Sequence, residues 1–253
     1  MDEQNLMIYE ELYQLGYIED EITEEEVESA EWDIPINTEY IKDKKMDYEV
    51  LGLITLFSNY NSKENHRYLY EKGYNSLYSN LDKMEEISNN KKRNIKRGIK
   101  KLTECDNEVV AICEDKEGRM YYKISPYACE DDKRGCFITI NSKMLEYLID
   151  VGNSNVIKTY CAIKILLWNN DKKCYIKRPL TRDFLLRYIG LSINGKNLTT
   201  MSNILKSLVN NGYIKRKRVI KQDKVNGEII TKDTYEYELV SVYEWEDFDK
   251  NSK

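Results

Sequence analysis

Hydrophobic positions in the stretch 179–239 follow two successive helical patterns. A short apolar segment covers residues 180–189, and a second segment places Met201, Leu205 and Leu208 at the three- and four-residue spacing of one helix face. Glycine directly follows the first segment, which favours an end to that helix. The spacing therefore predicts two helices joined by a turn.

The second of these helices is expected to end at Asn210-Asn211-Gly212. A basic stretch with strand-like spacing follows, and Asn226-Gly227 interrupts it with the residues that two-residue hairpin turns prefer. Helix, turn, helix and hairpin in this order are typical of a winged helix-turn-helix.

A similar order of elements is predicted earlier in the chain. Ile95, Ile99 and Leu102 lie 106 positions before Met201, Leu205 and Leu208. They fall in a basic helix that is preceded by the short apolar helix 81–88 and followed by a hairpin predicted from strands 109–112 and 120–124. A further apolar match pairs Leu53, Leu56 and Phe57 with Ile163, Leu166 and Leu167. The recurrence indicates tandem related domains.

The expected fold is α+β and mainly helical, with two tandem winged helix-turn-helix domains whose wings are β-hairpins. The expected organisation is an acidic N-terminal arm (1–36), a first winged-helix domain (37–127), a second winged-helix domain (136–243) and an acidic, aromatic tail (244–253). Residues 125–135 are interpreted as the linker. In the tail, Trp245 or Phe248 is expected to pack on the body or to form a dimer contact.

Smaller expectations concern the first domain. Asn80 is expected to cap helix 81–88, and the segment 88–90 is expected to end that helix and to cap the next one. His66 lies in a polar stretch and is interpreted as a surface residue without a catalytic partner.

The net charge of −5 conceals an uneven distribution. Residues 1–33 contain thirteen acidic residues and no Lys or Arg, which leaves the rest of the chain with 39 basic against 31 acidic residues. The body is therefore basic, as expected for a protein that binds nucleic acid. The acidic arm is either a solubilising tail or an element that competes with DNA or binds a partner.

Several functional classes are disfavoured. No apolar run approaches the length of a membrane span, and the acidic N-terminus does not resemble a signal peptide. Six cysteines without a CxxC pair and a single histidine favour free thiols in a reducing cytoplasm over a metal site. Phosphate-binding, dinucleotide-binding, zinc-protease and serine-hydrolase motifs are absent from the sequence. We therefore expect a cytoplasmic binding protein without cofactor or metal, not an enzyme.

The candidate DNA-binding residues fall into three sets. The helix of the second domain offers polar side chains suited to reading base edges: Asn194, Lys196, Asn197, Thr199, Thr200, Ser202, Asn203 and Lys206. The hairpin after it offers basic side chains suited to phosphate: Lys215, Arg216, Lys217, Arg218, Lys221 and Lys224. The helix of the first domain is mainly basic and is expected to supply affinity: Lys91, Lys92, Arg93, Asn94, Lys96 and Arg97. In the second domain, segment 192–197 is compatible with either turn or helix.

Each basic set has a plainer interpretation. Lysine-rich helix faces are common on protein surfaces, and lysines on strand edges protect against aggregation. Winged helices also bind proteins.

The residues 137–220 resemble the helix-turn-helix modules of phage and plasmid replication proteins of low-GC Gram-positive bacteria. The likeness lies in the strand and helix start FITINSKML, the helix TYCAIKILLW and the segment ILKSLVNNGYIKRKR. The tandem arrangement is also similar to plasmid initiators built from two winged helices. The turn SINGKNLTT is longer than usual, and the acidic arm is a further departure. The resemblance implies sequence-specific binding of double-stranded DNA.

The function expected from the sequence is DNA binding in replication initiation or maintenance of a plasmid or phage, or in transcriptional control of such an element. Double-stranded DNA is the expected partner, with a second copy of the chain or replication and transcription proteins as further candidates. The alternative is a winged-helix scaffold that binds proteins through the acidic arm.

Overall fold

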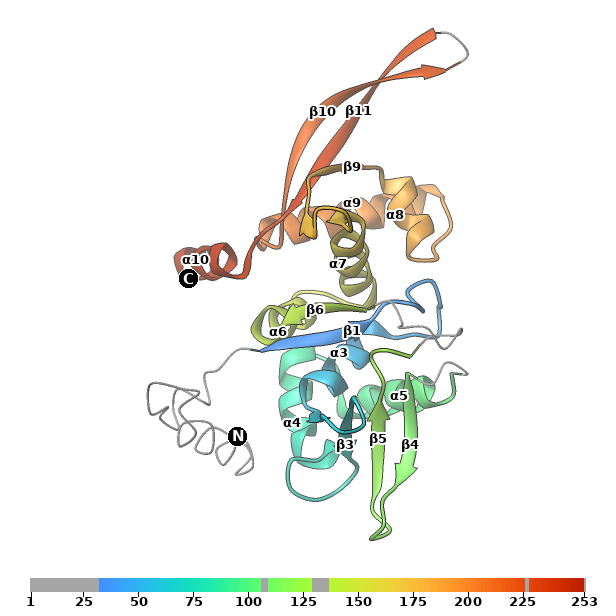
Figure 1. Ribbon diagram of the computed structural model, residues 1–253, viewed down its shortest axis with the longest axis vertical. Coiled ribbons are helices and arrows are strands. Elements are labelled where there is room, and N and C mark those ends of the chain that lie inside the picture. The colour runs from blue at the N-terminus through green and yellow to red at the C-terminus, as the bar shows by residue number, and fades with distance from the viewer. Residues whose placement is uncertain (1–31, 106–108, 129–136, 226–227, 253) are drawn as a thin grey trace. The chain divides into compact units, whose positions relative to one another are not determined.

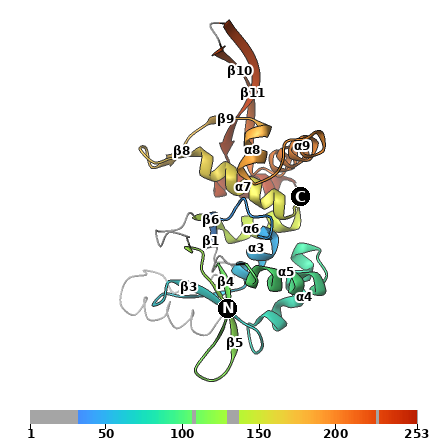
Figure 2. The same ribbon diagram turned by 90° about the vertical axis from the view of Figure 1, so that its right-hand side faces the viewer.

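The computed structural model describes residues 32–105, 109–128, 137–225 and 228–252. The chain has an α+β fold with several small antiparallel sheets, and Ile34–Lys253 forms one compact unit. None of the helices in the described ranges combines the length and hydropathy that crossing a bilayer requires. Figures 1 and 2 show the elements in two perpendicular views.

The described residues of the first half of this unit form three helices and five strands. Its elements are β1 (Asp33–Asn37), α3 (Tyr48–Leu56), β2 (Asn59–Asn61), β3 (His66–Tyr70), α4 (Leu77–Ser88), α5 (Lys92–Thr103), β4 (Val110–Glu114) and β5 (Met120–Ile124). Asp47 caps α3, and all residues of this helix from Tyr48 to Thr55 are buried. Strands β2, β3, β5 and β4 form one antiparallel sheet in that order.

The second half repeats the order of strand, two helices and hairpin, and it ends in a further helix. Its elements are β6 (Phe137–Asn141), α6 (Ser142–Asp150), α7 (Ser154–Leu167), β7 (Trp168–Asn169), β8 (Cys174–Tyr175), β9 (Arg178–Leu180), α8 (Arg182–Tyr188), α9 (Gly195–Asn210), β10 (Ile214–Val225), β11 (Glu228–Leu239) and α10 (Val242–Ser252). Strands β10, β11 and β9 form an antiparallel sheet in that order.

The internal repeat is visible in the topology. In each half a strand precedes two helices and a hairpin, and this strand pairs with the second strand of the hairpin: β3 with β5, and β9 with β11. The two apolar triads found in the sequence, on α5 and on α9, are buried in equivalent elements. The repeated spacing therefore reflects a repeated structure.

The two halves share one hydrophobic core. Helix α3 packs against α6 and α7, and β1 pairs with β6 across about a hundred positions of sequence. Gly190, which follows α8, has a φ of +75° and lies directly against the backbone of Lys42, which precedes α3. The predicted linker lies largely outside the described residues, and the domain boundaries stay a prediction.

Some sequence expectations were wrong. Helix α4 begins at Leu77 and is capped by Ser76, so Asn80 lies inside the helix, where its Nδ2 donates to the carbonyl of Ser76. The residue before α5 is Lys91, whose side chain makes no capping bond, so segment 88–90 ends α4 but does not cap α5. His66 is buried and lies on β3, with Nδ1 3.4 Å from a carboxylate oxygen of Glu64.

The packing expected of the C-terminal tail on the body is confirmed. Trp245 on α10 is buried, donates from Nε1 to the carbonyl of Asn211 and stacks on Tyr213. Four cysteines are free thiols, namely Cys105, Cys113, Cys161 and Cys174, and Cys129 and Cys136 lie outside the described residues. In the part of the chain that is described, no cluster of three His, Cys, Asp or Glu side chains is placed to bind a metal ion.

Candidate nucleic-acid interface

Capping residues fix the position of α9 relative to α8. The hydroxyl of Thr181 accepts from the backbone N–H of Phe184 at the start of α8. The side chain of Asn194 accepts from the backbone N–H of Asn197 at 2.8 Å. Helix α9 therefore begins at Gly195, and the segment that the sequence left open, 192–197, divides into a turn followed by the first residues of the helix.

Four of the predicted polar residues form one exposed stripe along α9. Lys196, Thr199, Asn203 and Lys206 recur every three or four residues, and all four are exposed. The side chains of Lys196, Asn203 and Lys206 form no hydrogen bond or ion pair within the described residues. These four side chains are therefore available to a ligand that extends along the helix.

The remaining predicted residues of α9 take part in internal hydrogen bonds. Nδ2 of Asn197 donates to the carbonyl of Ser192 at 2.7 Å and to its hydroxyl at 3.2 Å. Thr200 and Ser202 are half-buried and donate to the carbonyls four residues earlier. Asn194 is the helix cap, and its Nδ2 donates to the hydroxyl of Ser192. These residues shape the turn and the helix start in the structure.

We expect Asn197→Ala to lower the free energy of unfolding by about 1 kcal/mol, because two hydrogen bonds to the turn are lost. Urea unfolding followed by circular dichroism measures this change. Asn203→Ala is the matched control, since it removes an exposed amide on the same helix and should leave stability within about 0.5 kcal/mol. Equal losses in both variants would contradict the structural role of Asn197.

The hairpin β10–β11 has two chemically different faces at its base. Lys215 and Lys217 lie opposite Glu238 and Glu236 in the strand register, whereas Arg216 and Arg218 lie opposite Tyr237 and Tyr235. Lys215 also pairs with Glu244 of α10 at 2.8 Å, and its hydrogen bond is the main cause that lowers the pKa of Glu244 to about 2. The charges of the first face are therefore largely balanced.

The second face is aromatic and basic. The Arg216 guanidinium lies 5.0 Å from the ring centre of Tyr235. Tyr237 is buried, so this face is the one that turns toward the body. The side chains of Lys221 and Lys224 lie outside the described residues.

Arg182 is an interface candidate that the sequence reasoning missed. It is the first residue of α8, is exposed, and donates to the Ser202 hydroxyl on α9 at 2.8 Å. Burial raises the pKa of Tyr237, and the nearby charges of Arg216 and Arg182 oppose this rise. Arg182 thus lies near both the α9 stripe and the arginine face of the hairpin. A basic residue at the start of the preceding helix was the available signal.

The basic side chains of α5 differ from those of α9 because some of them contact other side chains of the protein. Lys92 pairs with Asp82 on α4, and the Lys96 ammonium lies 4.0 Å from the ring centre of Tyr78. Lys91, Arg93, Asn94 and Arg97 remain exposed and form no ion pair with a described carboxylate. No side chain caps the start of α5, so its first N–H groups add to the positive charge there. The start of α5 is therefore suited to phosphate.

Glu49 on α3 lies beside this helix. Its carboxylate accepts a hydrogen bond from Nδ2 of Asn90. Burial, reinforced by the charge of Asp47, raises the pKa of Glu49 from 4.5 to about 7. The folded state therefore binds the proton more tightly than the unfolded chain, and stability falls as pH rises through the interval between those two values.

Glu49→Gln is accordingly expected to raise the urea midpoint at pH 8 and to leave it nearly unchanged at pH 5. At pH 8 the wild-type carboxylate is ionised and incompletely solvated, whereas glutamine stays neutral. Urea unfolding at the two pH values measures the difference. A stabilisation of the same size at both would show that ionisation of Glu49 is not its cause.

The predicted residues thus assemble into two surfaces on equivalent helices. One combines the α9 stripe with Arg182, Arg216 and Arg218, and the other lies at the start of α5. Figures 1 and 2 show α9 next to the base of the hairpin β10–β11. Comparisons of the chain with protein-family models, with curated proteins and with solved structures found no match.

Proposed function

We propose that the protein binds double-stranded DNA through two winged helix-turn-helix units. In this proposal α4–α5 and α8–α9 are the helix pairs, α5 and α9 enter major grooves, and the hairpins β4–β5 and β10–β11 are the wings. One observation carries the proposal: the same order of elements and the same strand pairing occur twice, and each time the second helix exposes basic side chains. A surface that only contacts solvent would not require basic side chains on the equivalent helix of both halves.

The two helices suggest a division of labour. The α9 stripe contains Asn203 and Thr199, which suit base edges, flanked by Lys196 and Lys206, which suit phosphates. The start of α5 offers mainly charge, which gives affinity with a strong dependence on salt. We propose that α9 discriminates between sequences and that α5 anchors the protein.

The biological role that fits best is replication initiation or maintenance of a plasmid or phage, or transcriptional control of such an element. This part of the proposal rests on the resemblance of residues 137–220 to plasmid and phage replication proteins. It places the protein in the cytoplasm as a binding protein without catalytic activity.

A selection from random duplexes, followed by fluorescence anisotropy, tests the proposal. The selected site should bind at least about 1,000-fold more tightly than random duplex at ~0.15 M salt. Affinity for both should fall steeply as salt increases. Absence of salt-dependent binding at low salt would refute DNA binding and favour the protein-binding scaffold.

A further inference from the structure

We propose that a pocket between α5, α7 and the turn after α8 binds the phosphates of a nucleoside polyphosphate. The pocket has a volume of about 620 Å³, within the range of small-molecule sites. We call it the lysine pocket. Its lining residues are Lys44, Lys45, Met46, Asp47, Lys101, Glu104, Ser154, Asn155, Lys158, Ile189 and Leu191.

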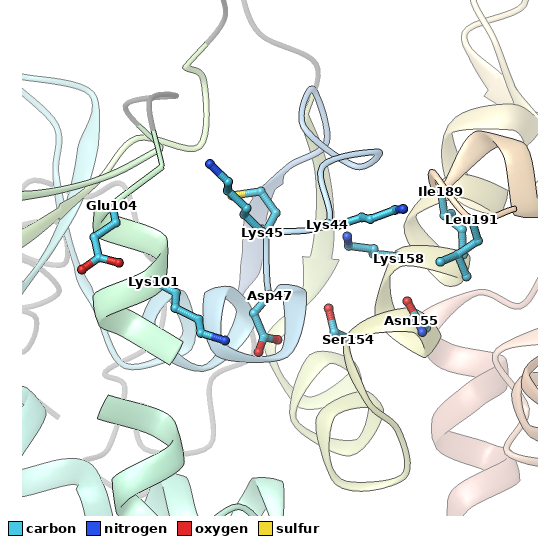
Figure 3. A pocket seen from close by; sticks show the side chains of 11 residues that line it. Lys44, Lys45, Asp47, Lys101, Glu104, Ser154, Asn155, Lys158, Ile189 and Leu191 are labelled. Carbon is cyan, nitrogen blue, oxygen red and sulfur yellow. The ribbon is translucent and has the colours of Figure 1, made fainter. Parts of the chain in front are cut away.

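Four ammonium groups line this pocket. Lys44 and Lys45 precede α3, Lys101 lies near the end of α5, and Lys158 lies on α7. Within the described residues, Lys44, Lys45 and Lys101 form no ion pair. Figure 3 shows Lys44 extending toward Ile189 and Leu191, Lys158 reaching from α7 toward the segment that carries Lys44, and Lys101 reaching from α5 toward Asp47. The arrangement leaves positive charge that forms no ion pair with any carboxylate of the described residues.

Lys158 makes the pocket more than a group of surface lysines. It is only 4% exposed, and its Nζ donates to the carbonyl of Asp43 at 2.8 Å and lies 5.3 Å from the Tyr48 ring centre. Burial lowers the pKa of Lys158. An ammonium has three N–H groups, so the bond to Asp43 leaves donors for an anion. The charges of Asp43 and Asp47 act on Lys158, but it forms no ion pair within the described residues, and a bound phosphate would offset the remaining cost of its burial.

The two carboxylates of the pocket have other partners. The Asp47 carboxylate accepts from the backbone N–H groups of Glu49 and Val50 at the start of α3. A carboxylate oxygen of Glu104 lies 3.8 Å from the ammonium of Lys100. The pocket therefore favours an anion over a cation.

The opposite wall suits the rest of a nucleotide. Half-buried Leu191, backed by the buried Ile189, supplies apolar surface for a base, and the half-buried start of α7 supplies Ser154 and Asn155. A site with an apolar wall, an amide and clustered ammonium groups matches a base joined to several phosphates better than inorganic phosphate alone. DNA is the other source of phosphate, and the experiment separates the two.

The test uses the full chain and fluorescently labelled ATP, without DNA. Anisotropy should show saturable binding, and unlabelled ATP, ADP, AMP and adenosine should compete in that order because each phosphate adds charge. Lys44→Ala/Lys101→Ala should weaken binding at least about tenfold, since two charge-assisted contacts are lost. Lys63→Ala/Lys83→Ala is the control, because it removes the same charge from exposed positions outside the pocket and should leave the affinity unchanged.

Three outcomes would overturn the proposal. They are the absence of binding at millimolar nucleotide in low salt, equal losses in the pocket and control variants, and competition by adenosine as strong as that by ATP. If labelled ATP does not bind but the pocket variant weakens duplex DNA more than the control does, the pocket contacts the DNA backbone instead. Circular dichroism of both variants checks that the fold is retained.

Discussion

Lys196→Ala/Lys206→Ala is expected to weaken duplex-DNA binding by roughly 50-fold at ~0.1 M salt, since each phosphate contact releases about one counterion. Both lysines lie on the exposed stripe of α9 and have no partner among the described residues. Their removal costs the described residues no hydrogen bond or ion pair, so the loss should appear in binding and not in stability. Anisotropy with a labelled duplex measures it.

The matched control for this prediction is Lys63→Ala/Lys83→Ala. Lys63 lies between β2 and β3, and Lys83 lies on α4. Both are exposed, and the change in net charge is the same. If the control weakens binding as much as the α9 variant, general electrostatic attraction and not the α9 stripe accounts for the affinity.

Gly190→Ala should lower the free energy of unfolding by about 3 kcal/mol or more, because two unfavourable effects combine. The φ of +75° belongs to a region that L-residues with a Cβ avoid. A Cβ at this position would also overlap the carbonyl oxygen of Lys42 and lie 2.9 Å from its Cα. The backbone on both sides would have to move, and with it the contact between the two halves of the chain.

Gly195→Ala provides the comparison for this second prediction. Gly195 is the first residue of α9, and no atom lies within 4 Å of the position its Cβ would take. Alanine favours helix more than glycine does, so stability should be unchanged or rise by up to ~1 kcal/mol. Urea denaturation measures the free energy of unfolding of both variants. Equal values would contradict the close approach of the Lys42 backbone to Gly190.

Local sequence signals predicted the elements that carry the interface. Helix spacing located the buried triads on α5 and α9. Turn residues located the hairpin whose first strand ends at Val225 and whose second strand begins at Glu228. Strand β5 was predicted with its observed bounds. These features depend on neighbours within a few residues, which is why the sequence alone was sufficient.

Features that depend on distant segments were not predictable. The polar surroundings of His66 indicate a surface position, but its burial depends on segments that its own neighbours do not specify. The pairing of Lys215 with Glu244 and the contact of Arg182 with Ser202 join residues 29 and 20 positions apart. The lysine pocket joins residues from 44 to 191. Spacing rules describe one element and carry no information about such encounters.

The measurement that tests the central claim most directly is the salt dependence of duplex-DNA binding for three proteins. These are the wild type, the α5 variant Arg93→Ala/Arg97→Ala and the α9 variant Lys196→Ala/Lys206→Ala. If both helices contact DNA, each variant should reduce the slope of log affinity against log salt by about 2, close to the value expected for two lost phosphate contacts. A wild-type slope in either variant would contradict binding by two equivalent units.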